Sequence, residues 1–176
     1  IVNAGAGNDD VNGSTQATPL TVDGGDGNDA ISGSTGADIL NGGAGDDAIS
    51  GNAGNDTIDG GDGNDSAIGG TGNDVFFGGA GSDLFTWNNG DNNDTVEGGA
   101  GGSDAVIFNG NAAGADTIAL TASGSRLQLD RTEGGVNVDM ADVENLTVNE
   151  LGGGVGTITV ADLSETHLVG LNLDLG

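Results

Sequence analysis

Aspartate recurs at a fixed place in a nine-residue pattern through the first half of this 176-residue chain. The spacing is unbroken from Gly24 to Asp83, and it resumes after an interruption at Trp87 and Asn88. A short carboxylate suits a turn and is a good ligand for a hard cation such as calcium, which takes about six to eight oxygen atoms. The pattern therefore predicts metal-binding carboxylates at Asp9, Asp29, Asp38, Asp47, Asp56, Asp65, Asp74, Asp83, Asp94 and Asp104.

Glycine occupies the first, second and fourth places of most of these units. Because glycine has no Cβ, it allows turn conformations that are closed to other residues, and it leaves peptide carbonyls free to point at a shared site. We expect such carbonyls to complete the ligand set of the cation. The glycines predicted to contribute are Gly25, Gly27, Gly43, Gly45, Gly61, Gly63, Gly70, Gly72, Gly79 and Gly81.

The units follow the pattern G-G-x-G-x-D-x-U-x, where U is apolar. Six run without interruption from Gly24, and they read GGDGNDAIS, GSTGADILN, GGAGDDAIS, GNAGNDTID, GGDGNDSAI and GGTGNDVFF. GGAGSDLFT follows as a seventh. This array resembles the RTX (repeats-in-toxin, hemolysin-type) calcium-binding family over roughly residues 4–107. One such nonapeptide is a weak signal, whereas seven in one register are a strong one.

The resemblance implies an all-β fold, a right-handed parallel β-roll (a β-solenoid) in which two nonapeptides form one coil. Alternate turns would then stack, with about 7–8 Ca²⁺ ions held between them by aspartate carboxylates and glycine carbonyls. Thr18 replaces the aspartate of the degenerate second unit, so no site is expected there. One stack would contain Asp9, Asp29, Asp47, Asp65, Asp83 and Asp104, and the other Asp38, Asp56, Asp74 and Asp94.

The eighth place of each unit is apolar and is expected to point inward from the middle of a three-residue strand. Burying one such side chain contributes about 1.5–3 kcal/mol, whereas ordering nine residues costs on the order of 9–18 kcal/mol of backbone entropy. Calcium binding and folding are therefore expected to be one event. The inward residues are predicted to be Val11, Leu20, Ile31, Leu40, Ile49, Ile58, Ala67, Phe76, Phe85, Val96 and Val106.

The chain has a formal net charge of -26, with 2 Lys+Arg, 38 Gly and no Cys. Such a composition suggests disorder unless a counter-charge is bound. It argues against nucleic acid as a partner, because almost nothing would neutralise phosphate. No apolar run is long enough to predict insertion into a membrane. Because the sequence opens on Ile1, we expect it to be a mature or excised part of a longer protein.

From Phe108 onward the nonapeptide gives way to alternating apolar and polar residues. The pattern predicts longer strands at 117–121, 126–130, 136–140, 146–148, 158–160 and 171–175. We therefore predict two parts, a calcium-binding roll over residues 1–107 and a β-strand-rich extension or cap over residues 108–176. The second part either continues the solenoid with wider coils or folds back on it.

Four residues outside the repeat pattern invite a chemical role, but a structural one is preferred for each. His167 is the single histidine, and we expect it at the surface. Trp87 is expected to pack where the register breaks, rather than to stack on a sugar. Arg126 and Arg131 are expected to pair with nearby carboxylates rather than to grip a polyanionic glycan.

These observations favour a non-enzymatic, secreted structural or cell-surface module with no catalytic residues. Calcium would control its folding and its assembly, through self-association or contacts with a cell surface or matrix. The family resemblance implies a bacterial extracellular protein exported by type I secretion. Two alternatives stay open, a glycan-binding accessory module and the C-terminal secretion and folding region of a larger secreted enzyme or toxin. Ice binding has little support, because Thr71 alone sits in a fitting turn.

Overall fold

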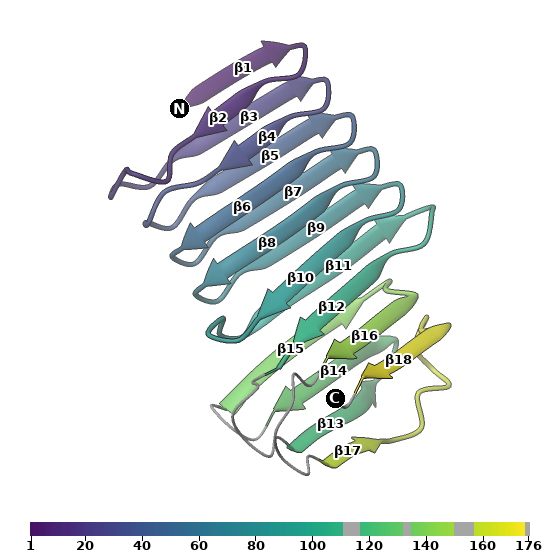
Figure 1. The fold of residues 1–176 in the computed structure, drawn as a ribbon. Coiled ribbons are helices and arrows are strands. Elements are labelled where there is room, and N and C mark those ends of the chain that lie inside the picture. Colours follow the sequence, from purple (N-terminus) through teal and green to yellow (C-terminus); the bar gives the residue numbers. More distant parts are fainter. Residues whose placement is uncertain (111–116, 132–134, 150–156, 175–176) are drawn as a thin grey trace.

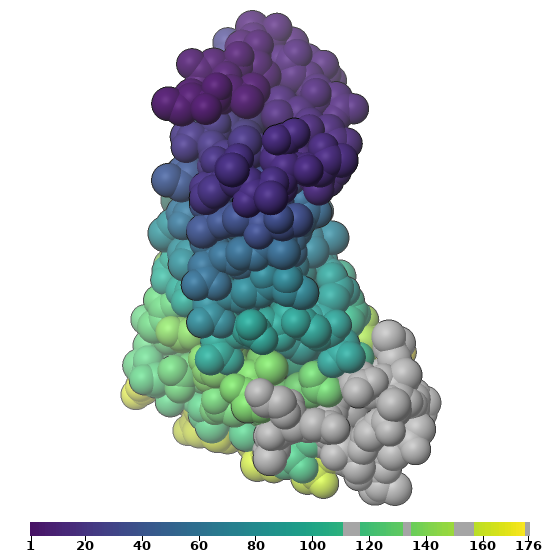
Figure 2. Space-filling view, turned by 90° about the vertical axis from the view of Figure 1, so that its left-hand side faces the viewer, coloured from purple at the N-terminus to yellow at the C-terminus, as the bar shows by residue number. Residues whose placement is uncertain are grey.

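The computed structural model describes residues 1–110, 117–131, 135–149 and 157–174, and these form an elongated stack of strands (Figure 1). Through the repeats, consecutive strands alternate between two sheets, so each coil adds one strand to each sheet. The chain is therefore a parallel β-solenoid over this part, as predicted. Figure 2 shows the resulting column, with the N-terminal coils at one end and the C-terminal strands at the other.

In the described residues the first sheet has ten strands. In spatial order they are β1 (Val2–Ala6), β3 (Thr21–Asp26), β5 (Ile39–Ala44), β7 (Thr57–Asp62), β9 (Val75–Ala80), β11 (Asp94–Ala100), β15 (Val136–Ala141), β14 (Arg126–Arg131), β13 (Thr117–Ser123) and β17 (Thr157–Val160).

The second sheet has eight strands within the same described ranges. In spatial order they are β18 (Gly170–Asp174), β16 (Asn145–Asn149), β12 (Ala105–Asn109), β10 (Leu84–Asn88), β8 (Ser66–Thr71), β6 (Ala48–Ala53), β4 (Ala30–Ser32) and β2 (Asp10–Asn12). None of the residues that the structure describes belongs to a helix long and apolar enough to cross a membrane.

The core of the repeat region consists of two rows of side chains from the eighth place of the units, one row from each sheet. Ile58 of β7 pairs in register with Leu40 of β5 and Phe76 of β9, and all three are buried. The rings of Phe76 and Phe85 stack with centroids 5.7 Å apart, beside the fully buried Ala67. Bulky rings therefore fill the core beside the small alanine.

Two sequence-based expectations about the strands were wrong. Strands β5 to β9 are six residues long rather than three, because they run on into the glycines that open the next unit. In the irregular second unit, Val22 rather than Leu20 takes the inward place, since Val22 pairs with Leu40 and is 1% exposed. Leu20 is only partly buried and packs at the edge of the core.

Both sheets continue past residue 107 into the C-terminal third, where strands lie at the predicted positions. The second sheet continues with parallel pairing from β12 through β16 to β18. In the first sheet, β15 pairs in parallel with β11, and β14 and β13 then add in antiparallel fashion. Leu175, at the end of the last predicted strand, lies outside the described residues. The proposed boundary at residue 107 stays a prediction.

Candidate metal sites

The repeat aspartates lie at the turns between the two sheets, where their side chains are directed inward. Nine of them, from Asp29 to Asp104, are buried, with exposed fractions of 1–3%. Asp9, in the first coil, is partly buried. The local reason is the turn itself, because the glycine that opens each unit leaves room for the carboxylate. A Cβ on Gly60, for example, would collide with Oδ2 of Asp65.

Hydrogen bonds from backbone N–H groups to side-chain carboxylates join the aspartates into two columns with the membership predicted from the sequence. In each column, Oδ1 of one aspartate accepts the backbone N–H of the aspartate in the preceding turn. Asp47 N donates to Asp65 Oδ1 over 2.8 Å in the first column, and Asp56 N donates to Asp74 Oδ1 over 2.8 Å in the second. The other bonds of this kind join Asp9 to Asp29, Asp29 to Asp47, Asp65 to Asp83, Asp83 to Asp104, Asp38 to Asp56 and Asp74 to Asp94.

The second carboxylate oxygen, Oδ2, is buried and has no hydrogen-bond partner in most of these turns. A buried ionised oxygen without a partner is strongly disfavoured, so the arrangement calls for a bound counter-charge. Within the described residues this is true of Asp9, Asp29, Asp47, Asp56, Asp65, Asp74, Asp83 and Asp94.

The electrostatics of the columns agree with this reading. Burial, together with the charge of Asp74 and Asp38 in the same column, raises the pKa of Asp56 to about 6. Burial and the charge of Asp74 and Asp91 raise the pKa of Asp94 to about 8. Without a cation, these carboxylates resist ionisation, and a divalent ion would reverse that preference.

Rows of backbone carbonyls run beside the carboxylates. The glycines at the second and fourth places of most units have positive φ, as in Gly61 (φ 106) and Gly63 (φ 138). A Cβ on Gly61 would collide with the carbonyl oxygen of Gly43, and one on Gly63 with that of Gly45. These carbonyls therefore point along the column from one turn to the next. The predicted glycines Gly25, Gly27, Gly43, Gly45, Gly70, Gly72, Gly79 and Gly81 share this positive φ.

The donor set fits a hard cation. In the described part of the chain, no three Asp, Glu, His or Cys side chains gather at one point that could hold a metal. A cation between two turns would therefore combine one or two carboxylates with backbone carbonyls, an all-oxygen set of the kind that calcium takes. Zinc and other metals that prefer sulfur and nitrogen are disfavoured, because the chain has 0 Cys and 1 His.

Asp38 and Asp104 differ from the other predicted ligands, because neither carries an Oδ2 that is buried and unpartnered. Both oxygens of Asp38 accept hydrogen bonds from neighbouring protein groups. Asp104 ends the first column of the repeats, and its own N–H donates to Glu144 Oε2 over 2.7 Å. The structure thus places both residues in the columns but surrounds them differently.

Two acidic residues near the columns were missed by the sequence analysis. Glu144 takes the next place in the first column, although it lies 40 residues beyond Asp104 in the chain. A signal was present, because Glu144 precedes Leu146 by two residues, as Asp104 precedes Val106, and these two apolar residues pair in register. Asp91 is 7% exposed, and burial raises its pKa to about 6. It lies in the unit that follows the interruption at Trp87 and Asn88, and no repeat position marks it.

The interruption at Trp87 is a packing feature. Trp87 is fully buried, and its ring stacks on that of Phe108 with centroids 4.2 Å apart and planes 7° apart. Its Nε1–H donates to the carbonyl of Asn92 over 3.0 Å. Arg131, also buried, lies 5.9 Å from the ring centroid of Trp87. Trp87 therefore packs at the register break, in the core.

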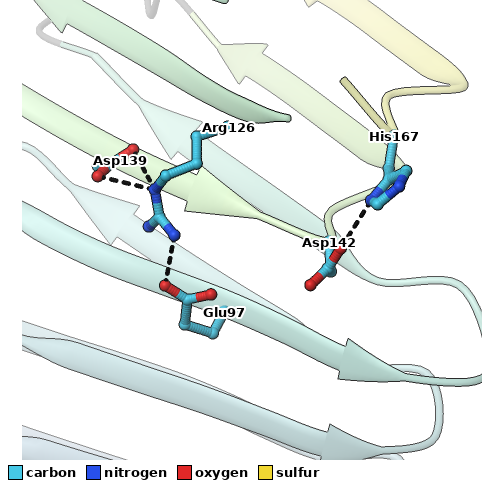
Figure 3. Close-up of polar contacts among 5 residues, drawn as sticks. All are labelled: Glu97, Arg126, Asp139, Asp142 and His167. Atoms are coloured by element: carbon cyan, nitrogen blue, oxygen red, sulfur yellow. Dashed lines mark hydrogen bonds and ion pairs between the residues drawn. The ribbon is translucent and has the colours of Figure 1, made fainter. Parts of the chain in front are cut away.

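Two basic groups of the C-terminal third, Arg126 and His167, contact acidic side chains (Figure 3). Arg126 binds Asp139 through Nε at 2.9 Å and Glu97 through Nη1 at 2.7 Å, so it ties β14 to β15 and β11. His167, whose side chain is 56% exposed, lies 2.6 Å from Asp142. The predicted pairing of Arg126 with carboxylates and the surface position of His167 are thus observed.

Comparison with known proteins agrees with the repeat pattern. A family model described as the RTX calcium-binding nonapeptide repeat (4 copies) matches residues 1–17, 23–58 and 50–85. No curated protein matches the sequence. The matched segments contain all the predicted ligand residues from Asp9 to Asp83. The repeat array over residues 1–85 belongs to the RTX family of calcium-binding nonapeptide repeats.

Proposed function

We propose that the chain is a non-enzymatic, secreted structural module whose folding is driven by calcium bound between stacked turns. The observation that carries the proposal is the set of buried, unpartnered Oδ2 atoms, arranged in two columns beside rows of carbonyl oxygens. Residues 1–107 would form the calcium-dependent roll. Residues 108–176 would extend or cap it through the strands that continue both sheets.

The ions would lie between successive turns of each column, with Asp47, Asp65 and Asp83 as representative carboxylate ligands. The carbonyls of the left-handed glycines, such as Gly43 and Gly45, would complete each set. The spacing of such sites gives about 7–8 ions for the chain. Each ion would neutralise carboxylates whose pKa is raised by burial, and so would remove the main electrostatic cost of folding the roll.

The thin core makes the dependence on calcium strong. Each strand from β3 to β9 buries one large apolar side chain at most, which contributes about 1.5–3 kcal/mol. The backbone entropy of the nine residues is several-fold larger, on the order of 9–18 kcal/mol. Extracellular calcium modules bind at about 10⁻⁴–10⁻³ M. The chain would therefore remain unfolded in a calcium-poor cytoplasm and fold after export, which suits type I secretion by a bacterium.

Self-association or contacts with a cell surface or matrix would give the folded module its structural role. A glycan-binding role has less support, because it needs accessible cations. The chain has 2 Lys+Arg. Arg126 contacts two carboxylates, and Arg131 is 5% exposed. An acidic polysaccharide would therefore meet a surface of largely the same sign as itself.

A calcium titration tests the proposal. The chain is freed of metal with chelator, and calcium or magnesium is added while far-UV circular dichroism follows strand formation. We expect a cooperative gain of strand signal with calcium near 10⁻⁴–10⁻³ M, on the order typical of extracellular sites. Magnesium serves as the control, because it demands compact octahedral geometry and releases its waters reluctantly. A strand spectrum that is complete in chelator and unchanged by calcium would overturn the proposal.

A further inference from the structure

The turn formed by residues 33–38 differs from the turns stacked in its column. Its second place holds Ser34, where most other units have glycine. Ser34 and Gly36 both lie outside the positive-φ region. In the next turn of the column, the matching residues Asn52 (φ 78) and Gly54 (φ 124) are left-handed. The backbone of this one turn therefore does not present its carbonyls as its neighbours do.

Ser34 closes this turn by bonding to Asp38. The Ser34 N–H donates to Asp38 Oδ2 over 2.5 Å, and its Oγ–H donates to Asp38 Oδ1 over 2.8 Å. Oδ1 also accepts the N–H of Leu20 over 2.6 Å. Ser34 is fully buried and Asp38 is 1% exposed, so these bonds are shielded from water. Ser34 Oγ additionally accepts the N–H of Gly36 over 3.0 Å, which fixes the loop in its closed form.

The contrast with the neighbouring turns is chemical as well as geometric. Asp56, the next carboxylate in the column, has a buried Oδ2 without a hydrogen-bond partner. Asp38 has no such oxygen, because the Ser34 N–H occupies the place in front of Oδ2. On the other side, the irregular unit offers Thr18 in place of a carboxylate. A cation at Asp38 would have to displace these hydrogen bonds, and it would find fewer oxygen ligands than elsewhere.

We propose that Ser34 replaces a calcium ion at this turn. The Asp38 turn is held by protein hydrogen bonds and takes no ion, whereas the other turns of the array take theirs. The inference rests on the proposed function, since it assumes that the unpartnered carboxylates of the other turns bind calcium. It removes Asp38 from the ligands predicted by the repeat pattern, and it makes Ser34 the residue that determines where the second column of ions begins.

The substitution Ser34→Gly tests the proposal by restoring the unit GGTGAD. Removing the hydroxyl frees one bond to Asp38 Oδ1. A left-handed φ at residue 34 would move its backbone N–H away from Oδ2 and reorient its carbonyl. Bound calcium is counted at saturation by equilibrium dialysis and native mass spectrometry. We expect S34G to bind one ion more than the wild-type chain. The control is Ser66→Gly, the same change at an exposed strand residue, for which the count should equal that of the wild type. Equal counts for S34G and the wild type would overturn the proposal.

A second measurement requires no variant. Crystals of the wild-type chain grown with calcium are examined for anomalous scattering from the ions. We expect peaks beside Asp47, Asp56, Asp65 and Asp74 and none in contact with Asp38. A peak on the Asp38 carboxylate would refute the role of Ser34 while leaving the proposed function intact. A wild-type chain with no ion at any turn would refute the proposed function itself, and this inference with it.

Discussion

Strands β3 to β9 of the repeat region bury at most one large apolar side chain each, whereas β13 to β16 of the C-terminal region bury two or three. In β7, Ile58 is the single buried residue of this kind, while β15 buries Val136, Val138 and Met140. The inward charges differ in the opposite sense. Each repeat turn from Asp29 to Asp104 carries a buried aspartate, whereas the hairpin of β13 and β14 has no buried aspartate and one buried arginine, Arg131.

The two regions therefore stabilise one continuous pair of sheets by different interactions. In the repeat region, hydrophobic burial is small and the carboxylates need an added cation. In the C-terminal region, burial is larger, and Arg126 partners Asp139 and Glu97 from within the chain. Substitutions in the repeat region should therefore act through calcium, and those in the C-terminal region should act independently of it.

The largest effect is expected from Asp65→Asn, in the middle of the first column. Asp65 borders two steps of the column through its bonds with Asp47 and Asp83. When the free calcium concentration is about 100 times the Kd of a site, the bound ion stabilises the fold by about 2.7 kcal/mol. Losing two ions should therefore cost about 5 kcal/mol. Urea unfolding at fixed calcium measures this loss. Asp59→Asn, an exposed aspartate on β7, should change stability little. Equal losses in the two variants would show that the column aspartates contribute no more to stability than exposed ones.

In the C-terminal region, Leu129→Ala should destabilise the fold by about 2–5 kcal/mol, because it leaves a cavity in a fully buried position. The loss of stability should be the same at two calcium concentrations that both saturate the sites. Gln128→Ala, on the adjacent and partly exposed position, should cost about 0.5 kcal/mol or less. A loss for L129A that grows or vanishes with calcium would show that the two regions are not held independently.

Two glycine substitutions compare the turns directly. Gly61 (φ 106) and Gly124 (φ 65) both have positive φ, so alanine at either position costs about 1–2 kcal/mol of backbone strain. A Cβ on Gly61 would also collide with the Gly43 carbonyl, whereas one on Gly124 meets nothing within 4 Å. G61A should therefore be less stable than G124A by about 1–3 kcal/mol, the range for overpacking. Thermal unfolding in calcium measures this difference in stability. Equal melting temperatures for the two variants would argue against close stacking of the turns.

Acidification should partly replace calcium in the repeat region. The pKa of Asp56, Asp65 and Asp74 is raised to about 6 in the calcium-free fold, from 3.8. The folded state then binds more protons than the unfolded state, so stability is lost as the pH rises through about 6. In chelator, we expect more strand signal by circular dichroism at pH 5 than at pH 8. Calcium affinity should change oppositely, because protons compete for the carboxylates. A calcium-free spectrum independent of pH would contradict this reading.

The smallest effect is expected from Arg126→Met. The side chains of Arg126 and Glu97 are 30% and 32% exposed, so their ion pair is partly screened by water. Pairs of this kind contribute about 0.2–1 kcal/mol. Denaturant unfolding at low and high salt should show a small loss that salt reduces. A loss of several kcal/mol would mean that Arg126 organises the C-terminal sheet rather than merely neutralising it.

Much of the repeat region could be predicted from the sequence, because each unit repeats the same local chemistry. The period, the two columns and nearly all inward residues follow from it. The register predicted for the irregular second unit was wrong, since its eleven residues place Val22 rather than Leu20 inward. The closing of the Asp38 turn by Ser34 depends on side-chain geometry that residue types alone do not give.

The C-terminal third could be predicted as strands but not as an arrangement. Alternation located β13 to β16, yet it carries no information about which strand pairs with which. The antiparallel pair β13 and β14 lies beyond β15 in the sheet. The chain therefore forms these outer strands first and only then places β15 beside β11. Glu144 reaches the first column through this non-local pairing, and a local repeat search stops before it.

Amide hydrogen exchange with and without calcium tests the central claim most directly, because it follows both regions in one experiment. In calcium, amides of β5 to β9 and of β14 to β16 should all be protected. In chelator, protection should be lost in β5 to β9, where the turns depend on the ion, and should fall much less in β14 to β16. Protection of β5 to β9 that survives chelator unchanged would contradict the claim that calcium between the turns stabilises the roll.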